Sequence, residues 1–571
     1  MYSSSEEWQK DYDALLVEIE EINSYKGKLN SREDLLSFLK LYEELGIKLE
    51  TVSIYASLSL ESDGQNPENQ RLMGLTATIG SMFGQYVSFF TPELLAIDRA
   101  LLLQWIEEPE FKDFKIFLEK NIYEAKHTLS AREEYLLSLN SKAAAGAANA
   151  YHDLCDIDLD FGYVGDEKLT ISNYVVFLRS KDEKVRKEAY EKLYGVYKNH
   201  ENTISKLYAA NVDKNLFYAK AKGFDSCLER ALFPDNVDKI VYKNLVDTVN
   251  ENLPILHRYY TLVKKVLKLD TLNHYDVYMP LVDSVESNYT YDEACLAIKE
   301  ATKVLGSEYQ DILYKGLTTD RWVDRYENEG KRSGAFSAGT YKNKPYILMN
   351  YKDNVISSLF TLIHEGGHSM HSYYSSKSNP FSCYDYTIFE AEVASTFNEQ
   401  LLSHYLLEST KDVEMKKYLL GSQLFSIVST LFRQTMFAEF ELLMHEIVEK
   451  GGVITCQVQK DTYQGLLEKY FGPELKFDKE LSCLECFRIP HFYRAFYVYK
   501  YATGISSSIT LAENVLAGNG LENYLAFLKS GGTKFPLDSL KLAGVDLSTK
   551  EPIEKAIKYF EKLLNEFSEL V

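Results

Sequence analysis

Long apolar runs are missing from this sequence, and cysteine is scarce in it. No stretch of about 18 or more apolar residues occurs, so no transmembrane helix is expected. Residues 1–7 contain no basic segment followed by an apolar one, so no secretory signal is expected either. The seven cysteines are scattered and odd in number, which indicates reduced thiols in a cytoplasmic protein. Cys483 and Cys486 form a lone C-x-x-C pair, for which a structural zinc or redox role is only a minor alternative.

Positive charge is also in short supply. Lys and Arg number 63 against 84 Asp and Glu, which gives a formal net charge of −21. Nucleic acid binding requires clustered basic residues, so this chain is a poor candidate for it. The negative charge favours solubility, with electrostatic steering of a substrate as the alternative.

Helical periodicity dominates what is present. Only 12 prolines interrupt the 571 residues, of which 45% are hydrophobic, and a chain of this size can bury a large core in two or more domains. Residues 33–58 place apolar side chains at spacings of three and four, and similar patterns cover 8–24, 114–138, 183–220 and 236–266. The sequence therefore predicts a mainly α fold, with an N-terminal helical domain over residues 1–200 and a larger domain over residues 201–571.

One region departs from this pattern. Gly334, Ala335 and Phe336 open a small-residue segment that leads through Pro345 into the apolar residues 346–350. Glycine and proline around a short apolar run predict a hairpin or small sheet. An edge strand at this point could pair with an extended peptide backbone, or the sheet could merely support the helix that follows.

That following helix contains the motif H-E-x-x-H. His364 and His368 lie one helical turn apart, so both imidazoles can reach one zinc ion. Glu365 lies beside the first histidine, where a carboxylate can take a proton from an attacking water molecule. His371 is a poor third ligand, because three ligands along one straight helix do not converge on a tetrahedral ion.

The two glycines inside this motif are unfavourable in a helix, so their presence calls for a structural explanation. Gly366 and Gly367 cost about 1 kcal/mol each relative to alanine in a helix interior. Their missing side chains allow either a substrate or another helix to approach closely.

A second helix offers carboxylates for the site. Glu392 and Glu399 are seven residues apart and share a face, whereas Glu390 points away from it. A carboxylate from this helix would complete a His₂Glu zinc site, and the other could hold the N–H of a ligating imidazole. Spacing alone leaves Glu392 open between a ligand and a residue on a solvated face.

Taken together, these segments resemble the oligoendopeptidase F branch of the thimet oligopeptidase-like zinc metallopeptidases. The matching stretches are residues 228–233, 332–337, 345–351, 364–373, 389–399 and 491–504. The resemblance implies a large helical ellipsoid with a deep substrate channel and a small β-sheet beside the zinc helix. It implies one Zn²⁺ held by His364, His368 and Glu392, with Glu365 as general base, and cytoplasmic endopeptidase cleavage of short unfolded peptides. The sequence departs from the family at Gly366, because relatives commonly carry a single glycine before the second histidine.

The family also implies hydrogen-bond donors from a Tyr-rich helix near the C-terminus. Pro490 is expected to open this helix, and donors on it would stabilise the oxyanion that forms when water attacks a peptide carbonyl. His491 and Tyr497 are the best candidates for this catalytic role. Tyr493 and Tyr499, together with the Gly334 segment, are expected to bind substrate, although any one of these tyrosines could instead be a packed aromatic.

Two alternative functions remain. A helical zinc carboxypeptidase would need an arginine that anchors a terminal carboxylate, and Arg488 and Arg494 are available. A non-catalytic peptide-binding protein is the other alternative, although the intact ligands and base argue against it. The sequence does not predict an oligomeric state.

Overall fold

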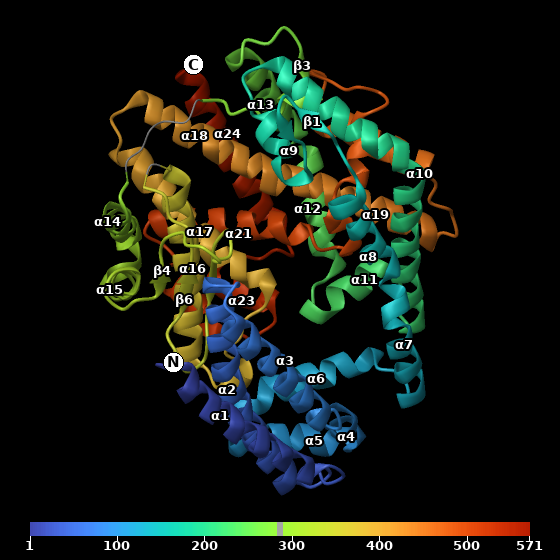
Figure 1. Cartoon of the computed structure of the whole chain (residues 1–571), viewed down its shortest axis with the longest axis vertical. Helices are drawn as coiled ribbons and strands as arrows, with labels where there is room; N and C mark the ends of the chain where they lie inside the picture. The colour runs from blue at the N-terminus through green and yellow to red at the C-terminus, as the bar shows by residue number, and fades with distance from the viewer. Residues whose placement is uncertain (283–288, 354) are drawn as a thin grey trace. The chain divides into compact units, whose positions relative to one another are not determined.

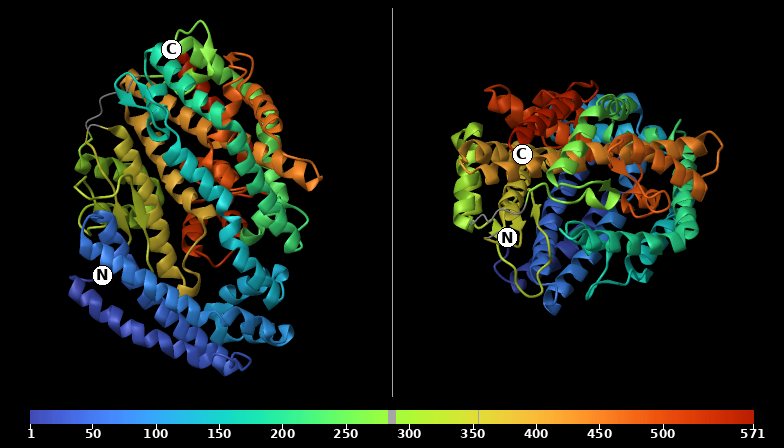
Figure 2. Two further views of the ribbon diagram at one scale, coloured as in Figure 1. Left: turned by 45° about the vertical axis from the view of Figure 1, so that its right-hand side comes forward. Right: turned by 90° about the horizontal axis from the view of Figure 1, so that it is seen from above.

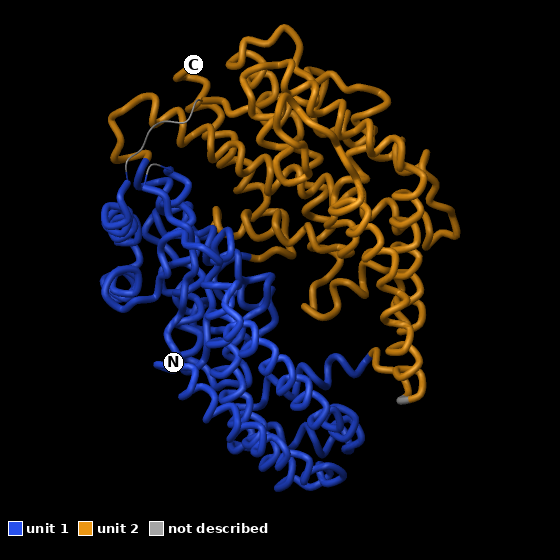
Figure 3. The backbone as a smooth tube through the Cα atoms, in the orientation of Figure 1, with its two compact units in different colours: residues 1–126, 286–406, 511–545 blue, residues 127–285, 407–510, 546–571 orange. Residues whose placement is uncertain are grey.

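The computed structural model describes residues 1–282, 289–353 and 355–571, and its fold is mainly α, as predicted (Figure 1). The chain divides into two compact units, each built from three segments (Figure 3). Unit 1 comprises residues 1–126, 286–406 and 511–545, and unit 2 comprises residues 127–285, 407–510 and 546–571. The expected boundary near residue 200 falls inside the continuous helix α10 (Glu183–Ala221), and the division into residues 1–200 and 201–571 stays a prediction.

The helices of unit 1 are α1 (Ser5–Glu18), α2 (Arg32–Ser62), α3 (Pro67–Val87), α4 (Phe90–Ala96), α5 (Arg99–Ile106), α6 (Lys115–Glu124), α14 (Tyr291–Ala301), α15 (Gly306–Leu317), α16 (Ile356–Ser378), most of α17 (Ile388–Ser409), α22 (Leu521–Ser530) and α23 (Pro536–Ala543). Helix α2 packs against α1 and α3 (Figure 1, Figure 2). Its apolar stripe, which includes Leu35 and Phe38, is buried in the core of these N-terminal helices.

The helices of unit 2 are α7 (Ala131–Ala144), α8 (Gly146–His152), α9 (Ile171–Leu178), α10, α11 (Cys227–Leu232), α12 (Lys239–Glu251), α13 (Leu253–Val266), α18 (Val413–Ile427), α19 (Arg433–Glu449), α20 (Cys456–Phe471) and α24 (Glu551–Glu569). Helix α21 (Tyr499–Leu516) has residues in both units. None of the helices within the described ranges has the length and hydropathy needed to cross a bilayer.

Local sequence explains where several of the predicted helices are interrupted. The periodic segments 33–58 and 183–220 each form one continuous helix, α2 and α10. The segment 236–266 forms two helices, because Pro254 lies in the first turn of α13 and cannot continue α12. The segment 114–138 is also divided, and Ser130 begins α7 with a capping box.

The predicted hairpin is present in unit 1. Strands β5 (Phe336–Ala338) and β6 (Tyr346–Leu348) are antiparallel, with Ser337 opposite Ile347. Strand β4 (Val323–Asp324) pairs with β6 in parallel, so the order β4-β6-β5 leaves β5 at an edge. Helix α16 packs against β5 and β6, which confirms a small sheet beside the motif helix.

The remaining strands form two small pairs in unit 2. Strand β1 (Tyr163–Val164) is antiparallel to β2 (Glu167–Lys168), and β3 (Leu272–Asn273) is parallel to β7 (Leu475–Lys476).

The C-x-x-C pair is buried in a short 3-10 helix, Ser482–Phe487. Burial raises the pKa of the Cys483 thiol to about 11 and that of Cys486 well above its ordinary value. All seven cysteines are free. A buried thiol with a raised pKa is a poor nucleophile and a poor metal ligand, so these residues behave as ordinary core thiols.

Candidate active site

Helix α16 carries the motif and is anchored by its apolar stripe. The helix begins at Ile356 and ends at Ser378. Leu359, Ile363 and Met370 are fully buried. This packing fixes the rotation of α16 and leaves the two motif histidines on a partly exposed face.

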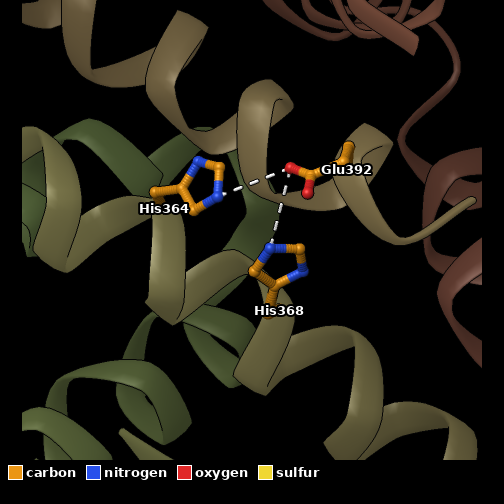
Figure 4. A group of neighbouring side chains, drawn as sticks. All are labelled: His364, His368 and Glu392. Carbon is orange, nitrogen blue, oxygen red and sulfur yellow. Dashed lines mark ion pairs between the residues drawn. The ribbon is translucent and has the colours of Figure 1, made fainter. Parts of the chain in front are cut away.

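The three predicted ligands meet at one point. His364, His368 and Glu392 each present a potential ligand atom, and these atoms all lie within 4.8 Å of one another (Figure 4). The Glu392 Oε2 atom is 3.5 Å from Nε2 of His364 and 3.8 Å from Nε2 of His368. Two imidazole nitrogens and one carboxylate oxygen form a His₂Glu set, which is a donor set typical of catalytic zinc.

Each imidazole also forms a hydrogen bond with a group other than Glu392. His364 Nδ1 lies 2.5 Å from Oε1 of Glu399, and His368 forms a hydrogen bond to the backbone carbonyl of Ala391. Both partners lie on α17, the helix that carries Glu392. These contacts orient the two rings so that each Nε2 faces the same carboxylate.

The two histidines titrate in opposite directions. Burial lowers the pKa of His364, but the hydrogen bond to Glu399 and the charge of that carboxylate outweigh it and raise the pKa to about 9. Burial and the neighbouring His364 lower the pKa of His368 to about 3. Glu399 therefore raises the basicity of one imidazole at the cluster, which fits the role predicted for it.

The buried surroundings of Glu365 favour the neutral form of its carboxyl group. Its side chain is buried, and this burial raises the pKa of Glu365 to about 7, although a hydrogen bond from the Ser337 backbone N–H opposes the rise. The Ser337 hydroxyl group is in turn 2.8 Å from the hydroxyl of Ser369 on α16. A carboxyl group with a pKa near 7 is suited to both accepting and returning a proton.

Edge strand β5 therefore contacts the candidate base directly. At the N-terminal side of β5, the Asn350 side chain donates hydrogen bonds to the carbonyl oxygens of Arg332 and Gly334, both at 3.0 Å. A pocket of about 400 Å³ adjoins this segment, and Gly334, Ala335 and Thr361 are among its lining residues. Thr361 precedes His364 by one helical turn on α16, so the pocket lies on the same helix as the cluster.

His371 is not a member of the cluster. Its ring is buried and stacks on Tyr386, with ring centroids 3.6 Å apart and planes 7° apart. Neither ring nitrogen has a hydrogen-bond partner among the described residues. His371 thus contributes packing, in agreement with its poor position for a third ligand.

The predicted C-terminal helix is wrong in its first half. Residues Pro490–Tyr493 form a short 3-10 helix, and α21 begins only at Tyr499. Between them, Phe496 has a φ of +54°, which an α-helix does not allow. The segment is rich in aromatic residues of modest helix propensity, so tertiary packing determines its course.

This turn nevertheless brings His491 and Tyr497 together within unit 2. Their ring centroids are 6.3 Å apart with nearly parallel planes. The Tyr501 hydroxyl group donates to that of Tyr497 at 3.5 Å, and the Arg494 guanidinium carbon lies 3.9 Å from the centroid of the Tyr497 ring. The four side chains form a polar cluster that we call the Tyr497 cluster.

The other two tyrosines are packed aromatics. Tyr493 stacks on Tyr151 at 4.1 Å between centroids. Tyr499 is fully buried beside Tyr242 and offers no surface to a peptide, which argues against the substrate-binding role predicted for it.

The two candidate arginines also differ in their surroundings. Arg488 forms an ion pair with the buried Glu485 at 3.0 Å, whereas Arg494 is exposed. Arg488 is therefore already engaged, and only Arg494 remains as a possible anchor for a terminal carboxylate.

Sequence reasoning missed three contacts of the candidate residues, two in unit 1 and one in unit 2. The Tyr386 hydroxyl group donates to the backbone carbonyl of His368 at 3.3 Å. Ser337 and Ser369 join β5 to α16, and Tyr501 joins the Tyr497 cluster. Only Tyr501 had a sequence signal, because it follows Tyr497 by four residues in an aromatic-rich segment.

Comparison with known proteins identifies related peptidases. Residues 176–559 match the model of peptidase family M3, and residues 93–161 match that of oligopeptidase F. An oligoendopeptidase F homolog from Borreliella burgdorferi is 45% identical over all of this chain and 97% of its own length. Oligopeptidase PepF from Bacillus subtilis is 41% identical over all of this chain and 86% of its own length.

Solved structures give the same result. A putative peptidase from Chlamydophila abortus superimposes with a TM-score of 0.93 at 36% identity, over all of this chain and 97% of that one. Oligoendopeptidase-F from Enterococcus faecium superimposes with a TM-score of 0.75 at 32% identity, over 99% of both chains. The chain therefore belongs to peptidase family M3, in its oligoendopeptidase F branch.

Proposed function

We propose that this peptidase is a zinc-dependent endopeptidase that hydrolyses short unfolded peptides in the cytoplasm. The observation that carries the proposal is the convergence of His364, His368 and Glu392 within 4.8 Å, beside the buried Glu365. These three side chains would hold one Zn²⁺, and Glu399 would orient His364. When bound, zinc supplies Lewis-acid polarisation of the scissile carbonyl and lowers the pKa of the attacking water.

The protein's own groups supply the proton transfers. Glu365, with its pKa near 7, takes a proton from the attacking water and returns it to the leaving amine. Its hydrogen bond from the Ser337 N–H fixes the carboxyl group against β5. The open edge of β5, with Gly334, Ala335 and Phe336, would hold the peptide backbone in an extended form.

The oxyanion requires donors that are already oriented. We assign this role to His491 and Tyr497, whose rings are held together in unit 2. One preorganised donor of this kind contributes about 3–4 kcal/mol to transition-state stabilisation. Tyr493 lies on the same short segment, stacks on Tyr151 and is only partly buried, and it would contact the peptide with its exposed part.

The test uses an internally quenched peptide of eight to ten residues that is blocked at both ends. We expect cleavage at an internal bond, loss of cleavage with a zinc chelator, and recovery when zinc is added back. Mass spectrometry of the products identifies the cleaved bond. No cleavage of the blocked peptide, with release of single residues from a free carboxyl terminus, would establish the carboxypeptidase alternative. Tight peptide binding without any cleavage in the zinc-loaded protein would establish the non-catalytic one.

A further inference from the structure

The turn that carries the Tyr497 cluster is strained. Phe496 has a φ of +54°, in the left-handed region that a bulky residue rarely occupies. Its ring is buried and packs on His445 and Tyr242, with centroid distances of 4.5 Å and 5.7 Å. The next residue, Tyr497, is only partly buried. The strained backbone therefore sends two adjacent aromatic rings to different surroundings, one into the core and one into the cluster. Strain of this kind persists only where other contacts enforce it.

One such contact comes from Glu441, in the middle of α19. The Phe496 backbone N–H donates a hydrogen bond to Oε1 of Glu441 at 3.0 Å, in fully buried surroundings. Glu441 is 0% exposed. Its other carboxyl oxygen, Oε2, has no hydrogen-bond partner within the part of the chain that the structure describes. Leaving a buried polar atom unpaired is destabilising, so this carboxyl group binds the Phe496 N–H at a cost in stability.

Among the described residues, no charged side chain pairs with Glu441. The Tyr208 hydroxyl group is near enough to Glu441 to interact electrostatically, but it has no hydrogen-bond partner in the described part of the chain. His445 lies one turn along α19, with Nδ1 at 2.8 Å from the Glu441 backbone carbonyl and Nε2 at 3.1 Å from the Asn215 side chain. Burial raises the pKa of Glu441 to about 8 and lowers that of His445 to about 4, so burial favours the neutral form of both groups. Glu441 thus acts as a neutral acceptor on a rigid helix and not as half of an ion pair.

We propose that Glu441 is a positioning residue for the reaction, whose buried carboxyl group holds the Phe496 turn in the conformation that places Tyr497 beside His491. The proposal rests on the proposed function in one respect, namely that His491 and Tyr497 stabilise the oxyanion. Glu441 is 0% exposed, so it acts through the turn that it holds. It determines where the Tyr497 hydroxyl group stands when the carbonyl is attacked, and a small misplacement of such a donor reduces the rate.

The experiment compares Glu441→Gln with Glu441→Leu in the zinc-loaded enzyme. Glutamine keeps an oxygen acceptor for the Phe496 N–H, whereas leucine has a similar volume and no acceptor. We expect the leucine variant to lose about 10- to 100-fold in kcat, with KM changed less than about threefold. The glutamine variant should stay within about threefold of the wild type in both. Glu441→Asp, which shortens the side chain by one methylene, gives the same readout as leucine if the leucine variant does not fold.

A double-mutant cycle separates positioning from general destabilisation. If Glu441 acts through Tyr497, then Glu441→Leu should reduce kcat by less than about twofold in a Tyr497→Phe background. Thr435→Val is the matched control, because Thr435 is also fully buried on α19 and its hydroxyl group donates to the Leu431 carbonyl, one turn before it in the chain, at 2.7 Å. This control should leave kcat unchanged.

The outcomes distinguish the two proposals. If Tyr497→Phe slows the enzyme and Glu441→Leu does not, the positioning role is wrong and the oxyanion role stands. Independent, multiplicative losses in the double variant would also overturn the positioning role. If His491→Ala and Tyr497→Phe both keep the wild-type kcat, the oxyanion role itself fails.

Discussion

Gly367 on α16 and Ala394 on α17 mark the point where the two ligand-bearing helices touch backbone to backbone. A Cβ atom at Gly367 would lie 2.6 Å from the carbonyl oxygen of Ala394 and 2.7 Å from Cα of Ser395. Glu392 precedes Ala394 by two residues. The second glycine of the motif therefore sets the separation between the helix that carries both histidines and the helix that carries the carboxylate.

The two motif glycines should respond differently to alanine. Gly367→Ala forces α17 away from α16, so we expect a loss of about 1–3 kcal/mol in unfolding free energy and weaker zinc binding. Gly366→Ala is the matched control. Its Cβ would meet only the flexible end of Leu313 at 3.1 Å, and alanine gains about 1 kcal/mol of helix propensity. Thermal unfolding and zinc competition with a chromophoric chelator measure both effects. Equal zinc affinities in the two variants would contradict the assignment of Gly367 to helix spacing.

Glu399 gives a prediction about metal affinity alone. Its carboxylate lies 2.5 Å from His364 Nδ1, on the side of the ring that faces away from Glu392. Glu399→Gln should weaken zinc binding by about 10- to 100-fold, because the imidazole loses a charged partner that raises its basicity. Glu569→Gln, which removes an exposed carboxylate at the end of α24, controls for the change in net charge. Unchanged zinc affinity in Glu399→Gln would show that this contact does not tune the ligand.

The cluster was predictable from sequence because helical periodicity fixes which residues share a face. His364 and His368 are four residues apart, and Glu392 and Glu399 are seven apart, so each pair had to project together once its helix formed. The β5–β6 hairpin could also be predicted from the sequence, because glycine and proline lie on either side of its short apolar strands. Placing Glu392 at the metal site still required the family resemblance, since spacing alone allowed a solvated face.

The Tyr497 turn could not be predicted in the same way. No glycine or proline occurs between Pro490 and Gly504, so local sequence favours an uninterrupted helix. The contact that holds the turn comes from Glu441, 55 residues away from Phe496. The burial of His371 has a similar origin, because the rings that cover it, Tyr386 and Phe527, lie on distant segments. Such positions depend on tertiary contacts that periodicity does not encode.

Glu365 provides the most direct test of the proton-transfer mechanism. Glu365→Gln keeps the size of the side chain but cannot accept a proton from water. We expect zinc content equal to that of the wild type and a loss of about 10²- to 10⁴-fold in kcat, which is the usual contribution of a general base. Metal analysis and cleavage of the doubly blocked peptide measure these two properties on one sample. Turnover at the wild-type rate would exclude Glu365 as the base.

Glu485 gives a prediction about stability that is independent of the active site. The residue is 1% exposed in unit 2, where it pairs with Arg433 and Arg488 and accepts a hydrogen bond from Tyr463 at 2.8 Å. Burial alone raises the pKa of Glu485, but Arg433, His274 and Arg488 outweigh it and hold the pKa well below its ordinary value. Glu485→Gln leaves two mostly buried guanidinium groups, 14% and 12% exposed, without their carboxylate, so we expect a loss of about 3–5 kcal/mol in unfolding free energy at pH 7. Glu480→Gln breaks the exposed pair with Lys198 and should cost less than about 1 kcal/mol.

The same carboxylate sets a pH dependence with a definite sign. Because the pKa of Glu485 is lower in the folded protein, its stabilising effect is complete above the unfolded value of about 4.3 and is lost as the pH falls towards the folded value. The difference in unfolding free energy between the wild type and Glu485→Gln should therefore narrow below about pH 4.3, by up to about 1.4 kcal/mol per pH unit. Urea unfolding of both proteins between pH 7 and pH 3 measures this difference. A gap that stays constant or widens in acid would show that Glu485 is not ionised in the folded protein.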